Sequence, residues 1–219
     1  MVEVSTSILS VKKENILGTI YNLEVAKTDY YHIDVMDGEF VENNTNNLMQ
    51  EYLTSIKEIS NIPLDIHLMV NNIKTFVDAY LPFEPNIITF HIEACKNKEE
   101  VLEIIKYIKN NNVKVGIAVK PKTKIEKIYE YIPLIHEVLV MTVEPGKGGQ
   151  KLIPETVEKV KQLKQYLEKE KLDIDIEVDG GVTIENKEIL KNAGANILVS
   201  GSCIVNSKDY KEAIQAIKE

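Results

Sequence analysis

Short β-branched runs alternate with longer amphipathic stretches along the whole chain, and few folds accommodate such a pattern. The alternation is typical of parallel strands linked by helices. We expect eight strand and helix pairs, with a helix after each strand. The strands are predicted at Glu3–Leu9, Tyr30–Val35, Leu64–Met69, Ile87–His91, Lys114–Ala118, Glu137–Thr142, Asp173–Val178 and Asn196–Val199.

The helical patterns that follow these strands carry apolar residues at three- and four-residue spacing. Eight pairs in 219 residues leave about 27 residues per pair, enough for a closed β/α barrel without a further domain. The predicted fold class is therefore α/β, a single (β/α)8 TIM barrel over residues 1–219. An open doubly wound sheet is the competing architecture, because strand counting alone does not exclude it. The clearest helices are predicted at Lys98–Lys109, Glu155–Glu170, Ile184–Asn192 and Lys208–Ile217.

Composition narrows the class of partner. The net charge of −8 argues against a nucleic acid and favours a small metabolite. All 26 basic residues are lysines, so a phosphate would have to be held by backbone N–H groups or by lysine. Cys95 and Cys203 cannot form a disulfide framework and are expected to be reduced. The sequence shows no membrane segment and no secretory signal, and we expect a cytoplasmic protein.

Polar side chains recur on one face of two predicted strands. His32, Asp34 and Met36 alternate with aliphatic residues, and Asp65, His67 and Met69 repeat the arrangement on the next strand. The carboxyl ends of barrel strands form the functional face of this fold. A single histidine in a strand is more often a hydrogen-bonded core residue.

Taken together, however, His32, Asp34 and His67 would meet at the barrel mouth, and imidazole with carboxylate is a ligand set for divalent metals. Asp179, where the seventh strand ends, is a fourth candidate, although an aspartate before glycines is also a common turn or capping residue.

Glycine-rich loops follow the last three strands, at residues 144–150, 180–181 and 200–202. Glycine lets backbone N–H groups approach an anion closely, as in the phosphate sites of barrels around strands seven and eight. Glycine in such turns is as often needed only for a positive φ.

The motifs HIDVMDG, LDIHLMV, ITFHIEA, VMTVEPGKGGQ and IEVDGGV, which begin at residues 32, 64, 88, 140 and 176, resemble those of the ribulose-phosphate 3-epimerase family. With the segments SILS at residue 7 and VSGS at residue 199, they cover nearly the whole chain in the family's order. The resemblance implies a barrel of the ribulose-phosphate-binding type and a place in the pentose phosphate pathway. It also implies a homo-oligomer.

The resemblance further implies the reaction and its residues. The family interconverts D-ribulose 5-phosphate and D-xylulose 5-phosphate at C3, with one acid/base group on each face, here Asp34 and Asp179. One divalent ion (Zn²⁺, Fe²⁺, Mn²⁺ or Co²⁺) would be bound by His32, Asp34, His67 and Asp179, with no organic cofactor. Met36, Met69 and Met141 would line the site, either over the reacting carbons or as packing of the barrel top. Substrate contacts would come from Ser7, His67, Gly146, Lys147, Gly148, Gly149, Asp179, Gly180, Gly181, Gly201 and Ser202.

Two positions depart from the family's usual pattern. Lys147 stands where phenylalanine is common, and Glu42 stands where proline is usual; both bear on the substrate loops. The alternatives are an epimerase for allulose 6-phosphate, which would use the same groups, and a barrel that binds sugar phosphate without catalysis. A related lyase or decarboxylase would need a lysine at the reacting centre, and the strands at 32–36 and 64–69 contain none.

Overall fold

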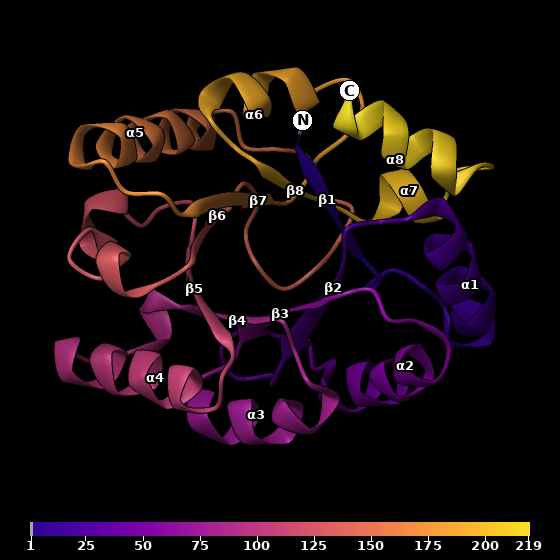
Figure 1. Cartoon of the computed structure of the whole chain (residues 1–219), viewed down its shortest axis with the longest axis horizontal. Coiled ribbons are helices and arrows are strands. Elements are labelled where there is room, and N and C mark those ends of the chain that lie inside the picture. Colours follow the sequence, from indigo (N-terminus) through magenta and orange to yellow (C-terminus); the bar gives the residue numbers. More distant parts are fainter. Residues whose placement is uncertain (1) are drawn as a thin grey trace.

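The computed structural model describes residues 2–219, which form a closed barrel of eight parallel strands. Each strand pairs with the next along the chain, and β8 pairs with β1 to close the ring. Figure 1 shows this ring with the helices around it. The predicted (β/α)8 barrel is confirmed, and the open sheet is excluded. The strands are β1 Glu3–Ser7, β2 Tyr30–Met36, β3 Leu64–Met69, β4 Ile87–His91, β5 Lys114–Val119, β6 Glu137–Met141, β7 Asp175–Asp179 and β8 Ile197–Ser200.

The helices lie outside the ring; a short 3₁₀ turn leads directly into α1 and another directly follows α3. The α-helices are α1 Ile16–Ala26, α2 Asn46–Ile59, α3 Ile73–Tyr80, α4 Lys98–Asn110, α5 Glu155–Glu170, α6 Lys187–Ala193, α7 Ser202–Val205 and α8 Tyr210–Lys218. The 3₁₀ turns are η1 Lys13–Asn15, η2 Leu81–Phe83, η3 Ile92–Ala94, η4 Ile125–Ile128 and η5 Ile132–Leu134. Within residues 2–219, no helix is both long and apolar enough to cross a bilayer.

The expectation of a helix after every strand is wrong for the connection from β5 to β6. This segment forms only the two 3₁₀ turns η4 and η5. Pro133 lies in the first turn of η5 and has no N–H for a continuing α-helix. Ile125, Ile128 and Ile132 are nevertheless buried, because a 3₁₀ turn places residues three apart on one side.

Two helix starts differ from prediction because side-chain hydrogen bonds to the backbone fix where each helix begins. Asn186 accepts from the backbone N–H of Thr183 and donates to Gly181 O, so residues from Ile184 form a turn and α6 begins at Lys187. Asp209 accepts from the N–H of Glu212 and caps α8, which begins one residue later.

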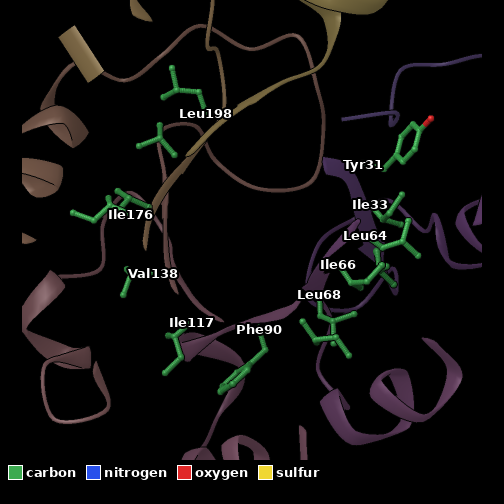
Figure 2. Packing of buried hydrophobic residues seen from close by; sticks show 14 of the residues in the cluster. Tyr31, Ile33, Leu64, Ile66, Leu68, Phe90, Ile117, Val138, Ile176 and Leu198 are labelled. Atoms are coloured by element: carbon green, nitrogen blue, oxygen red, sulfur yellow. The ribbon is translucent and has the colours of Figure 1, made fainter. Parts of the chain in front are cut away.

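The main hydrophobic core lies between the barrel wall and the helices. Ile33, Ile66 and Leu68 are fully buried and belong to this layer, as the period-two pattern of β2 and β3 predicted. Figure 2 shows them with Phe90 and Leu198 on the outside of the strand ring. Burying each such side chain contributes about 1.5–3 kcal/mol, and the outer layer therefore supplies most of the stability of the fold.

The interior of the barrel, by contrast, contains buried polar groups. Asp65, Glu137 and Glu177 lie inside the ring, where Ser5 Oγ donates to Asp65 (2.8 Å) and Thr89 Oγ1 donates to Glu137 (3.1 Å). Buried carboxylates are costly unless they are paired or protonated. The mouth of the barrel, at the carboxyl ends of the strands, lies next to these polar groups.

Candidate metal and substrate site

The structure brings together the four residues that the sequence suggested as metal ligands. His32 and Asp34 come from β2, His67 from β3 and Asp179 from β7. Strand register places Asp34 beside His67, and Asp179 ends β7 beside Met141, which ends β6. One ligand atom from each of the four residues lies within 4.8 Å of all the others.

The nitrogen atoms that face the centre of this group are buried and have no hydrogen-bond partner among the described residues: His32 Nε2 and His67 Nδ1. Each lies 3.5 Å from Asp34 Oδ1, and His67 Nδ1 lies 3.7 Å from Asp179 Oδ2. These separations exceed hydrogen-bond length. Buried polar atoms rarely lack partners, and two imidazole nitrogens with two carboxylates suit a divalent transition metal. The four residues therefore fit a cation.

Neighbouring side chains hold the candidate ligands from outside. His32 Nδ1 lies 2.5 Å from Asp65 Oδ2, which fixes the ring with Nε2 toward the centre. Ser7 Oγ donates to Asp34 Oδ2 (2.7 Å). Such partners orient metal ligands and set their tautomers.

The surroundings move the pKa values of the two mouth carboxyls in opposite directions. Burial favours the neutral form of Asp34, but the nearby charges of His32 and His67 outweigh it and hold the pKa of Asp34 well below its usual range. Burial, together with the charge of Asp34, raises the pKa of Asp179 to about 6. Asp34 is therefore ionised at neutral pH, whereas Asp179 titrates close to neutral pH.

A second group that could hold a metal lies deeper, formed by His32, Asp65 and Glu177. Its histidine nitrogen is already bonded to Asp65. Burial, with the charges of neighbouring carboxylates, raises the pKa of Glu177 well above its usual value and that of Glu137 to about 8. Protonation thus accounts for these buried carboxyls, and the four residues at the mouth are the better candidates for holding a metal ion.

A cavity of about 440 Å³ opens above the candidate ligands. Asp34 and Asp179 line it, whereas His32 and His67 are fully buried and are not among its lining residues in the described chain. His67, which was also expected to contact substrate, is buried below the cavity, and its Nδ1 is directed at Asp34 and Asp179. The other expected site residues all line the cavity: Ser7, Met36, Met69, Met141, Gly146, Lys147, Gly148, Gly149, Gly180, Gly181, Gly201 and Ser202.

The turn after β7 requires its two glycines. Gly180 has φ +119°, and a Cβ there would lie 2.3 Å from Val143 Cγ2. Gly181 has φ +68°, and a Cβ there would lie 2.4 Å from the backbone nitrogen of Leu152. The pair lets the chain turn close beside the loop after β6, so the two loops form one side of the cavity.

The loop after β6 also contacts the loop after β2 across the mouth. Asn43 Nδ2 donates to Gly146 O (2.6 Å), and Gln150 Nε2 donates to Glu144 O and Lys147 O within the loop itself. Lys147 is exposed at the rim. The loop is thus fixed by side chains from both loops.

Sequence reasoning assigned no role to His91 and Glu93, although both occur in a quoted motif. His91 Nε2 lies 2.9 Å from His67 Nε2, and His91 Nδ1 lies 3.1 Å from Glu93 Oε2. Burial lowers the pKa of His91 to about 4, so its ring is neutral at pH 7. The sequence did contain an indication: His91 ends the strand that follows the strand of His67, and the alternation of side chains along it turns His91 toward the inside of the barrel.

Comparison with known proteins gives consistent matches. A family model described as the ribulose-phosphate 3 epimerase family matches residues 3–205. Ribulose-phosphate 3-epimerase of Bacillus subtilis (strain 168) is 36% identical over 219 residues, covering 100% of this chain and 99% of that protein. The Methanocaldococcus jannaschii enzyme of the same name is also 36% identical, covering 100% and 91%.

A solved structure shows the same architecture at lower identity. KGPDC from Streptococcus mutans superposes with a TM-score of 0.73 at 11% identity, covering 100% of this chain and 96% of that one. At this identity the likeness bears on the fold alone.

Proposed function

The chain belongs to the ribulose-phosphate 3 epimerase family and is an isomerase, and from this premise we propose that Asp34 and Asp179 interconvert D-ribulose 5-phosphate and D-xylulose 5-phosphate by proton transfer at C3. The observation that supports this proposal is geometric. The two carboxylates come from β2 and β7, line one cavity, and lie above two buried histidines. Related proteins named as this enzyme support the pentose phosphate over a ketohexose phosphate.

Inversion at C3 requires one base that removes the proton next to the C2 carbonyl and one acid that returns a proton to the opposite face. Asp34, held ionised by the histidines and by Ser7, is suited to accept the proton in one direction. Asp179, whose pKa is about 6, is suited to donate from the other side. In the reverse direction the two residues exchange roles, and each ends the reaction in the state in which the other began.

We propose that His32, Asp34, His67 and Asp179 hold one divalent metal ion, with Zn²⁺, Fe²⁺, Mn²⁺ and Co²⁺ as the candidates. When bound, such an ion supplies Lewis-acid stabilisation of negative charge on substrate oxygens. The chain's own contribution is to keep both histidine nitrogens directed at one point through buried partners.

The phosphate end of the substrate is proposed to lie against the turns at Gly180–Gly181 and Gly201–Ser202, with the loop at 146–149 beside them. Backbone N–H groups in such turns bind anions without a guanidinium, and this chain contains no arginine. Lys147, in the loop at 146–149, also lines this cavity. Met36, Met69 and Met141 form an apolar cover that keeps water from the flat intermediate.

Family membership also supports work in the pentose phosphate pathway and a cytoplasmic location. Assembly as a homo-oligomer stays a prediction.

The experiment is proton NMR of ribulose 5-phosphate in D₂O with purified protein loaded with Co²⁺ or Zn²⁺. We expect deuterium at C3 and the growth of xylulose 5-phosphate signals. Allulose 6-phosphate, run in parallel, should react more slowly. A loaded, folded sample that neither exchanges C3 nor forms product would refute the proposal and favour a non-catalytic binding barrel.

A further inference from the structure

A chain of hydrogen bonds runs from His67 to the loop after β5. His67 Nε2 meets His91 Nε2 at 2.9 Å, and His91 Nδ1 meets Glu93 Oε2 at 3.1 Å. The other oxygen of Glu93 accepts from the backbone N–H of Lys120 at 2.8 Å. The proposed reaction uses none of His91, Glu93 and Lys120.

The carboxylate of Glu93 determines which atom donates in each of the two histidine hydrogen bonds. A neutral imidazole has one donor and one acceptor nitrogen, whereas an ionised carboxylate only accepts. His91 therefore donates from Nδ1 to Glu93 and accepts at Nε2. His67 must then donate from Nε2, which leaves the lone pair of its Nδ1 directed at Asp34 and Asp179.

We propose that His91 and Glu93 are positioning residues that hold His67 in the tautomer able to bind the divalent cation through Nδ1. This inference rests on the proposed metal role of His67. It adds that the tautomer is set by a carboxylate on a different strand end, two hydrogen bonds away from the cation.

The surroundings of the chain keep it rigid and dry. His91 is fully buried, with the Phe40 ring 4.9 Å away, centroid to centroid. Lys120 Nζ lies 3.7 Å from the centroid of the Phe40 ring. Lys159 Nζ donates to Lys120 O and Pro121 O, which fixes the backbone whose N–H anchors Glu93. Because the His91 ring is fully buried, its orientation is set by its contacts with Glu93 and His67.

The substitution Glu93→Gln tests the proposal sharply because it keeps the size of the side chain. Glutamine offers one acceptor oxygen, whereas Glu93 accepts from two donors on two oxygens. In one orientation the amide NH₂ would face the backbone N–H of Lys120, and in the other it would face the N–H of His91 Nδ1. The second clash is relieved only if the proton of His91 moves from Nδ1 to Nε2. Reversal would place the proton of His67 on Nδ1 and remove the lone pair from the cation position.

The first readout is the dissociation constant for Co²⁺, followed by its visible absorption. We expect Glu93→Gln to weaken binding by about 10- to 100-fold, in the range seen for partners of metal-bound histidines. Glu93→Asp should restore part of the affinity, because it keeps two acceptor oxygens. The matched control is Glu100→Gln. Glu100 also accepts a hydrogen bond from a backbone N–H, that of Lys96, but among the described residues it makes no hydrogen bond to a histidine.

The second readout is ¹⁵N NMR of histidine-labelled protein without metal. In the unsubstituted protein His67 should carry its proton on Nε2, and Glu93→Gln should shift it toward Nδ1. A proton on Nδ1 in the unsubstituted protein would overturn the inference, even if Glu93→Gln failed to fold.

Equal Co²⁺ affinity of Glu93→Gln and the unsubstituted protein would also overturn it while leaving the metal site intact. If the unsubstituted protein bound no Co²⁺ at all, the proposed metal site and this inference would fail together.

Discussion

Asp34 and Asp179 line the same cavity but meet opposite electrostatic surroundings. Asp34 lies against two imidazoles and a serine hydroxyl, which favour its ionised form. For Asp179, burial and the charge of Asp34 outweigh the opposing effects of His32 and His67, and its pKa rises to about 6. Pairs of titratable groups whose pKa values are pushed apart mark acid and base roles. The two carboxylates should therefore not be interchangeable.

We predict that Asp179→Asn abolishes epimerisation while leaving one half of the proton exchange. The amide keeps an oxygen for a cation but cannot transfer a proton. Product formation should fall by about 10²- to 10⁴-fold, measured by NMR in D₂O. Exchange at C3 should persist for only one of the two pentose phosphates, the one whose proton faces Asp34.

The control is Asp173→Asn, an exposed aspartate before the same strand. Turnover by Asp179→Asn at the rate of this control would show that Asp179 is not an acid/base group.

Two glycines of this barrel, one in the turn after β7 and one in α1, should respond in opposite ways to substitution by alanine. Gly181 has a positive φ in the turn after β7 and approaches the backbone of Leu152, whereas Gly18 lies exposed in α1 with nothing within 4 Å of an added Cβ. We predict that Gly181→Ala destabilises the protein by about 1–3 kcal/mol and raises KM. Gly18→Ala should stabilise it by about 0.5–1 kcal/mol with KM unchanged.

Urea unfolding and steady-state kinetics on both variants check this prediction. Equal stability of the two variants would mean that the turn after β7 is not constrained as described.

Element positions were predictable where the apolar period was long and regular. The range of α5 matched the prediction, and β3 and β4 did as well. The 3₁₀ turns between β5 and β6 were not predictable in this way, because the buried isoleucines fit a 3₁₀ turn and an α-helix almost equally. Only Pro133 indicated that an α-helix would not form. The prediction for the start of α6 was wrong because that start depends on two hydrogen bonds of the Asn186 side chain, which the apolar pattern does not show.

At the scale of the whole molecule, closure of the ring creates the site. Strand parity predicted that His32, Asp34 and His67 share a face, but Asp179 joins them only because β7 comes to the same level of a closed barrel. Its place at the end of the seventh strand made Asp179 a candidate in advance, and the resemblance of motifs implied that it belongs with the other three. The partners of the ligands were missed, because Asp65, His91 and Glu93 acquire their roles from distances of 2.5 to 3.1 Å that no spacing in the sequence specifies.

The central claim is that one cation lies among four side chains at the mouth of the barrel. Anomalous diffraction at the cobalt edge, from crystals of the unsubstituted protein grown with Co²⁺, locates such an ion directly. We predict one strong peak per chain, within bonding distance of His32 Nε2, Asp34, His67 Nδ1 and Asp179. A peak instead between Asp65 and Glu177, or no peak in the barrel at all, would contradict the account.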